Sequence, residues 1–273
     1  MEFPALFTFS QSSLQDYADC ARRFQLRYLE RLAWPAIETE PTLENERRQQ
    51  AGQLFHRMAQ QALVGIPLEK LEKLAGSPEL AKWWQSFSAD YPKIANAEKL
   101  YPEIALSAPL GGYRLTAKFD LIAVSNGKAT IYDWKTYHKR PRNEFLSVRW
   151  QTRVYRWLLA EAGKHLNGGK DFSPEQIEMI YWFTEFPDEP ARFPYNAGQF
   201  ERDRAGLEKT IREISQAGEY PKVDENEIDK TCRFCTYRSY CARGASAGDW
   251  REAEIEAEIM PEIMLDQIAE IEL

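Results

Sequence analysis

The sequence has no run of apolar residues approaching the ~20 that a helix needs to cross a membrane. Its first residues, Met1 to Pro4, contain neither the basic segment nor the apolar stretch of a secretory leader. Only four cysteines occur in 273 residues, too few for the disulfide framework of a secreted domain. We therefore expect a cytoplasmic protein without a membrane segment, whose cysteines bind a metal or remain as buried thiols.

The glycine-rich loop Gly-x-x-x-x-Gly-Lys-Ser/Thr is also missing, which excludes a P-loop motor within this chain. The chain does contain ample apolar material, because 44% of its residues are hydrophobic and 13% are aromatic. This composition predicts a packed core rather than wholesale disorder. A length of 273 residues suits one domain with insertions better than two full domains.

The charge is distributed unevenly along the chain. The formal net charge is −7, but residues 245–273 alone contribute −8 and residues 1–244 therefore carry +1. Residues 128–156 contain eight basic residues and two acidic ones, Asp133 and Glu144, and so carry a net charge of +6. The basic residues are Lys128, Lys135, Lys139, Arg140, Arg142, Arg149, Arg153 and Arg156. Such a stretch suits phosphate binding, although a solvated helix face next to a basic loop has the same pattern.

The hydrophobic periodicity predicts helices first and strands later. Helices are expected from Ser12 to about Leu32, from Leu43 to Val64, and in a short segment that begins at Ser77 and Pro78. The remaining segments read as strands at 100–107, 112–124, 128–136 and 177–186, with helices at 144–165 and 199–217. This order predicts a mixed α/β domain, with helices on both sides of a small sheet.

Asn126 and Gly127 form the strongest hairpin signal in the chain, because both residue types favour a type I′ turn. Counting back equally from this turn places Asp120 directly opposite Asp133, with Cβ atoms about 5 Å apart. Lys135 follows on the same face. The other face is expected to carry the apolar side chains of Leu115, Phe119, Leu121, Tyr132 and Trp134.

Two carboxylates that face each other across a hairpin repel and destabilise the sheet. A divalent cation between Asp120 and Asp133 would reverse the sign of this term, because hard cations prefer carboxylate oxygens. Two alternatives remain open from the hairpin alone. The acids could be exposed on a wet sheet face, or a bulge could shift the register and separate them.

The constellation of Asp120 followed by Asp133-Trp134-Lys135 resembles that of the PD-(D/E)XK nuclease superfamily, and the rest of the chain resembles its RecB-like branch. Further motifs occur in the order found in that branch: a helix opening at Ser10, Gly52-x-x-x-His56, Gln151-x-x-x-Tyr155, and the cysteines at 232, 235 and 241. One departure is Ala117, where the branch usually has glycine. The resemblance implies a restriction-endonuclease-like core, a mixed sheet flanked by helices, with N-terminal helices and a C-terminal cysteine-cluster segment.

The resemblance also implies roles for individual residues in phosphodiester hydrolysis. Asp120, Asp133 and the Trp134 backbone carbonyl would bind Mg²⁺ or Mn²⁺, with His56 as a further ligand or neighbour. Lys135 would orient the attacking water, while Gln151 and Tyr155 would hydrogen-bond to the phosphate, the DNA backbone or a catalytic lysine. Glu103 is a further carboxylate that could lie near the metal. The nucleic acid would contact Lys139, Arg140, Arg142, Arg149 and Arg153.

His56 lies well away from the apolar stripe of its own helix, so its position is not that of a core residue. Helical side chains lean toward the N-terminus, over the residue one turn earlier. For His56 that residue is Gly52, which we expect to leave room for a metal or a phosphate beside the ring. The alternative is an exposed helix histidine.

Cys232, Cys235 and Cys241 need a fourth ligand for a tetrahedral site, and the only other cysteine is Cys20. Four cysteines suit either a [4Fe–4S] cluster or a structural Zn²⁺, and their spacing does not choose between the two. The family resemblance favours the iron–sulfur cluster. Either group would join the two ends of the domain, so its expected role is structural.

These observations predict a single RecB-like nuclease domain at 1–244, with a helical insertion at about 35–98 and a cysteine-cluster segment at 229–244. The acidic, amphipathic tail at 245–273 could dock on a protein partner or a second copy, cover the basic region, or remain solvated. We expect a single-stranded DNA exonuclease of repair or recombination. A CRISPR-associated nuclease that processes spacers and a non-catalytic nucleic-acid-binding iron–sulfur scaffold are the alternatives.

Overall fold

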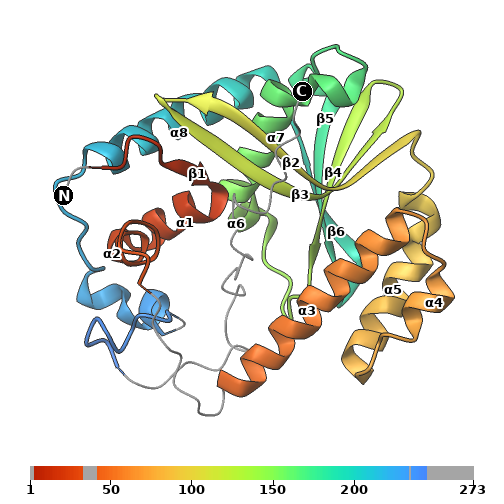
Figure 1. Cartoon of the computed structure of the whole chain (residues 1–273), viewed down its shortest axis with the longest axis horizontal. Coiled ribbons are helices and arrows are strands. Elements are labelled where there is room, and N and C mark those ends of the chain that lie inside the picture. Colours follow the sequence, from red (N-terminus) through yellow and green to blue (C-terminus); the bar gives the residue numbers. More distant parts are fainter. Residues whose placement is uncertain (1–2, 33–41, 234, 245–273) are drawn as a thin grey trace.

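The computed structural model describes residues 3–32, 42–233 and 235–244, with only the backbone of 42–46 (Figure 1). The predicted tail at 245–273 lies outside the described residues, as does part of the predicted insertion. Six strands form one mixed sheet: β1 (Thr8–Ser10), β2 (Lys99–Leu110), β3 (Tyr113–Ser125), β4 (Lys128–Lys135), β5 (Ile177–Phe183) and β6 (Phe186–Pro194). The predicted mixed sheet flanked by helices is confirmed.

Strand β3 lies at the centre of the sheet and has three partners. It pairs antiparallel with β2 along nearly its whole length, so β1 and β4 share its other edge. On that edge β4 pairs antiparallel as far as Leu121↔Tyr132, and β1 pairs parallel between Thr8↔Arg114 and Ser10↔Thr116. Residues 117–120 lie between these two partners. Within the described residues they have no strand partner on that edge, which leaves a gap in the sheet.

The turn between β3 and β4 has the predicted geometry. Asn126 and Gly127 have φ values of 51° and 71°, and Ser125 pairs with Lys128 as a type I′ turn requires. A second tight hairpin joins β2 to β3 through Gly111 and Gly112, which also have positive φ. Strands β1 and β6 were not predicted, because β1 has three residues and β6 contains three prolines.

The prediction that one apolar face runs along the whole hairpin is wrong. Leu115 and Phe119 pack in one core cluster, whereas Leu121, Tyr132 and Trp134 belong to a second cluster on the opposite side. The alternation of side chains breaks between Phe119 and Leu121, beside Glu103 of β2, whose φ is 53°. At this break the β2–β3 register omits the pair Glu103–Asp120.

Helices cover both faces of the sheet (Figure 1). The first core cluster packs against α1 (Gln11–Asp19), α2 (Ala21–Phe24), α6 (Asn143–Val148), α7 (Trp150–Ala162) and α8 (Ala197–Gln216). The second packs against α3 (Thr42–Leu63), α4 (Leu68–Glu72) and α5 (Pro78–Ile94). Ser77 caps α5 by accepting from the Leu80 N–H, with Pro78 in the first turn as predicted.

Two of the predicted helices are interrupted. The first breaks at Cys20, which is extended with φ −163° and ψ 110°, and resumes as α2 and a π-helical turn at Gln25–Leu29. The helix predicted at 144–165 breaks at Arg149, which has ψ 143° and separates α6 from α7. Hydrophobic periodicity continues across both breaks, so the pattern alone does not reveal them.

Candidate active site

The predicted metal-binding acids lie in the gap between β3 and β4. Asp120 and Asp133 are the first residues beyond the last backbone pair, Leu121↔Tyr132, so the two strands part where the acids stand. The Trp134 backbone N–H donates to Asp120 Oδ2 over 2.8 Å. The Asp120 carboxylate therefore replaces the backbone carbonyl that a paired strand would offer to the Trp134 N–H. This hydrogen bond holds Asp120 beside the backbone of β4.

Asp120 faces helix α3, where it meets His56. His56 Nδ1 lies 3.2 Å from Asp120 Oδ1. Burial alone would raise the pKa of Asp120, but the charge of His56 and the hydrogen bonds from His56 and Trp134 outweigh it and hold that pKa below its usual value. Burial alone would lower the pKa of His56, and the Asp120 carboxylate outweighs it and raises that pKa. The pair is thus arranged to keep a negative charge on Asp120.

Glu103 completes a potential metal-ligand group with these two residues. One ligand atom each from His56, Glu103 and Asp120 lies within 4.8 Å of the others. Glu103 also forms an ion pair with Lys118. The sequence around Glu103 indicated only weakly that this residue would lie near the metal-binding acids. The structure reveals its position, because the left-handed backbone conformation of Glu103 lies opposite the break in side-chain alternation at Asp120.

Asp133 lies on the α7 side of the gap and is only 3% exposed. Its Oδ2 is 2.9 Å from Lys135 Nζ, and its Oδ1 accepts from Gln151 Nε2 over 2.8 Å. Lys135 is itself buried, and its ammonium group lies 5.6 Å from the Tyr137 ring centroid and 5.5 Å from that of Tyr181. Lys135 is therefore not a surface lysine, and its charge lies within the carboxylate site.

Tyr155 is buried beneath the carboxylate site and does not face the solvent. It is 2% exposed, its hydroxyl donates to the Lys118 carbonyl over 2.8 Å, and Gln151 Nε2 donates to it over 3.3 Å. Burial and the charges of Asp133 and Asp120 hold the pKa of Tyr155 well above its usual value, so the hydroxyl remains a donor. Tyr155 thereby satisfies a carbonyl on the unpaired stretch of β3.

The expectation that Gly52 leaves space for a metal or phosphate is wrong. A Cβ at Gly52 would lie 3.3 Å from Thr136 Oγ1, so Thr136 occupies the space above this turn of α3. Thr136 directly follows Lys135 in the sequence. The glycine therefore allows α3 to approach the end of β4, and this contact brings His56 to the carboxylates.

Comparison with known proteins agrees with this geometry. A sequence profile described as the PD-(D/E)XK nuclease superfamily matches residues 8–242. The chain belongs to this nuclease superfamily. The predicted superfamily and its restriction-endonuclease-like fold are therefore confirmed. No curated protein matches the sequence.

Solved structures are similar to this PD-(D/E)XK nuclease at low identity. A crystal structure from Eubacterium rectale, of a protein provisionally named an exonuclease, has a TM-score of 0.51 at 11% identity and covers 97% of this chain and 94% of that one. The crystal structure of SSO0001 has a TM-score of 0.41 at 14% identity and covers 86% and 85% of the two chains. Within the described part of the nuclease, no helix combines the length and apolarity needed to span a membrane.

The predicted nucleic-acid-binding residues separate into two groups. Arg153 Nε lies 2.7 Å from Asp203 Oδ1, and its guanidinium stacks on Trp150 at 4.3 Å. Arg140 donates to the Glu189 carbonyl over 2.7 Å and stacks on Phe183. Internal contacts thus hold these two cations.

The other predicted basic residues are more available to a ligand. Lys139 and Arg142 are exposed, and neither forms an ion pair with any residue in the described ranges. Arg149 is intermediate, since its Nη1 lies 3.9 Å from Asp19 Oδ2 and its guanidinium stacks on Phe145. Of the predicted basic residues, Lys139 and Arg142 are therefore the most accessible.

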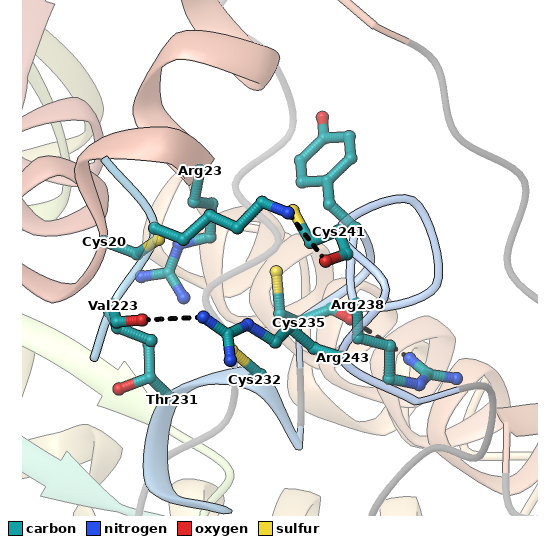
Figure 2. A pocket seen from close by; sticks show the side chains of 11 residues that line it. Cys20, Arg23, Val223, Thr231, Cys232, Cys235, Arg238, Cys241 and Arg243 are labelled. Atoms are coloured by element: carbon teal, nitrogen blue, oxygen red, sulfur yellow. Dashed lines mark hydrogen bonds between the residues drawn. The ribbon is translucent and has the colours of Figure 1, made fainter. Parts of the chain in front are cut away.

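The four cysteines, which are all free thiols, come together at a second site (Figure 2). They line one small, partly open cavity together with four cations: Arg23, Lys222, Arg238 and Arg243. All four cysteines lie in the described ranges, and no three of their sulfur atoms are within 4.8 Å of one another. Burial raises the pKa of the Cys232, Cys235 and Cys241 thiols. Cys20, at the break after α1, lines this cavity together with the cysteines of the C-terminal segment.

Proposed function

We propose that this nuclease is a deoxyribonuclease that binds Mg²⁺ or Mn²⁺ in the gap between β3 and β4. The observation that carries the proposal is the convergence there of two carboxylates, a histidine and a buried lysine. Carboxylate oxygens and an imidazole nitrogen are suitable ligands for these cations. Asp120, Asp133 and His56 are the proposed ligands, together with the Trp134 carbonyl. Glu103 is added because its carboxylate lies within 4.8 Å of the ligand atoms of His56 and Asp120.

A bound divalent cation supplies positive charge to the phosphate and lowers the pKa of a coordinated water. Lys135 orients the attacking water and stabilises the negative charge that develops on the phosphate, because its ammonium group is held at Asp133 in a nearly dry site. Gln151 keeps Asp133 in place by donating to Oδ1. Tyr155 fixes the adjacent stretch of β3 through the Lys118 carbonyl.

The depth of the site supports single-stranded DNA as substrate. Asp133 and Lys135 are 3% and 8% exposed, and helices cover both faces of the sheet around them. A single strand can deliver one phosphate into such a recess more readily than a stiff duplex can. We therefore propose a single-stranded DNA exonuclease of repair or recombination, with Lys139 and Arg142 as the first phosphate contacts.

We also propose that Cys20, Cys232, Cys235 and Cys241 hold a [4Fe–4S] cluster, as in the RecB-like branch. Around one Zn²⁺ with bonds of about 2.3 Å, the sulfur atoms would lie only about 3.8 Å apart. No three of the sulfur atoms of these described cysteines lie so close together, which supports a group larger than one Zn²⁺, and the four surrounding cations suit a cluster of net negative charge. Anaerobic purification should yield about four irons per chain. One zinc per chain and no iron would refute this proposal.

The nuclease activity is tested with end-labelled single-stranded DNA and Mn²⁺. Lys135→Met keeps the apolar stem of the side chain and should reduce cleavage by at least about a hundredfold. Lys209→Met is the matched control, since Lys209 is 76% exposed on α8, and it should cleave like the wild type. Equal product from wild type and Lys135→Met would refute the catalytic role, and DNA binding without cleavage by the wild type would favour a scaffold.

A further inference from the structure

Helix α1 connects the cysteine cavity to the catalytic helix α7. Its last residue, Asp19, precedes Cys20, and its first residue, Gln11, donates from Nε2 to the Tyr155 hydroxyl over 3.4 Å. The helix has only nine residues from one end to the other. A helix of this length is short and stiff, so a displacement of Cys20 would also move Gln11, which contacts Tyr155.

Gln15, in the middle of α1, supplies a cap that α7 lacks. The residue preceding α7, Arg149, makes no side-chain capping bond, and the first turn of α7 contains no acidic residue. Gln15 Oε1 instead accepts from the Trp150 backbone N–H over 3.2 Å. The first N–H groups of a helix need such acceptors, so a residue of another helix holds the start of α7.

The capped end of α7 is the end that faces the carboxylates. Gln151 directly follows Trp150 and donates to Asp133 Oδ1 over 2.8 Å, and Tyr155 lies one turn later. A shift or fraying of this first turn would move the donor away from Asp133. Gln15 is therefore linked to Asp133 by two hydrogen bonds and the peptide bond between Trp150 and Gln151.

Gln15 is held in turn by the residue beside Cys20. Its Nε2 donates to Asp19 Oδ1 over 2.7 Å, while Asp19 Oδ2 pairs with Arg23 Nη2 at 2.8 Å. Arg23 lines the cysteine cavity (Figure 2). Both oxygens of Asp19 are thus used, one toward the active site and one toward the cavity.

We propose that Gln15 is a positioning residue of the nuclease site, and that helix α1 transmits the state of the cysteine site to Gln151 through Asp19 and Gln15. The proposal rests on the proposed function and deepens it. The group bound by the cysteines then does more than join the ends of the chain, because it sets the position of the helix that holds Asp133.

The first test is hydrogen–deuterium exchange of the amides at Trp150 to Thr152 in the full chain. Gln15→Leu removes the cap and should speed their exchange roughly five- to tenfold. Gln15→Glu keeps an acceptor oxygen for the Trp150 N–H but loses the amide that donates to Asp19, so it should restore slow exchange only in part. Gln216→Leu, at the exposed end of α8, is the matched control. Unchanged exchange in Gln15→Leu would overturn the assignment of Gln15.

The second test asks whether the cysteine site acts through the same residues. Cys20→Ser should speed exchange at the same amides, and the double variant Cys20→Ser with Gln15→Leu should exchange no faster than Cys20→Ser alone. Additive effects would show independent sites and overturn the transmission. Asp19→Ala leaves every cysteine in place and should match Gln15→Leu, so the link is tested even where Cys20→Ser does not fold. Slow exchange in Asp19→Ala would also overturn the transmission.

Kinetics separate a positioning role from a merely structural one. Gln15→Leu should lower kcat roughly tenfold at temperatures well below its unfolding, with KM for DNA unchanged and partial recovery in Gln15→Glu. A lower unfolding temperature with unchanged kcat would overturn the positioning role. The exchange measurements need no turnover, so an inactive wild type would refute the proposed nuclease function and leave the test of α1 intact.

Discussion

Asp120 accepts a hydrogen bond from the backbone N–H of Trp134 over 2.8 Å, one step beyond the last backbone pair of β3 and β4. The same carboxylate meets His56 through its other oxygen. Asp120 therefore has two tasks, since it stabilises the place where the strands part and offers a ligand oxygen there. Substitutions can separate the two tasks.

Asp120→Asn keeps an acceptor for the Trp134 N–H but removes the negative charge. We expect its free energy of unfolding to stay within about 1 kcal/mol of the wild type, because the hydrogen bond survives. Cleavage should fall by at least about a hundredfold, because the charge that would bind the cation is gone. Denaturant unfolding and cleavage assays measure the two effects.

Asp120→Ala serves as the comparison for Asp120→Asn. It leaves the Trp134 N–H without its acceptor and should cost about 1–3 kcal/mol of stability in addition to the activity. Similar stability for the alanine and asparagine variants would show that this hydrogen bond does not support the strands.

Tyr155→Phe should affect stability more than chemistry. The hydroxyl donates to the Lys118 carbonyl in the interior, so its loss should cost about 1–2 kcal/mol. Because Tyr155 is 2% exposed, we expect KM for DNA to remain unchanged and kcat to fall less than about tenfold. A large rise in KM in steady-state assays would instead show that the hydroxyl binds the substrate directly.

The hairpin and its turn could be predicted from the sequence because the information is local. Asn126 and Gly127 determine the turn, and the register follows by counting from it. The gap beside β3 could not be predicted in this way. It depends on β1, which comes from the N-terminal part of the chain and pairs only with residues 114–116, so that among the described residues the next four positions of that edge have no strand partner.

The site residues show the same division between local and distant causes. Sequence motifs brought attention to His56, Asp133 and Gln151, which the fold places around the gap. Pattern alone did not reveal that Thr136 fills the space over Gly52. The pattern also did not reveal that Arg153 forms an ion pair with Asp203, because these two residues are 50 positions apart in the sequence.

The two classes of basic residue predict opposite phenotypes for otherwise similar substitutions. Arg142→Ala removes an exposed cation and should weaken DNA binding, with a salt dependence reduced by about one charge and little change in stability. Fluorescence anisotropy at several salt concentrations measures both the affinity and its slope.

Arg153→Ala is the counterpart, because it breaks the ion pair with Asp203 and the stacking on Trp150. It should lower the free energy of unfolding by about 1–3 kcal/mol and leave the salt slope of DNA binding unchanged. A reduced slope in Arg153→Ala would show that Arg153 leaves Asp203 to contact phosphate.

Loss of one cysteine should release the C-terminal segment before the rest of the domain. Among the described residues of 217–244, only Cys232 and Tyr237 are buried, and the Tyr237 hydroxyl donates to the Leu32 carbonyl over 3.0 Å. With so few buried anchors, we expect the order of the segment to depend on the group that we propose the cysteines bind. In Cys241→Ser, limited proteolysis followed by mass spectrometry should therefore find the first cuts between residues 217 and 244.

Thr236→Ala, an exposed substitution in the same segment, is the control and should resist the protease like the wild type. First cuts in the sheet or in α7 would mean that the cysteine site stabilises the whole domain at once.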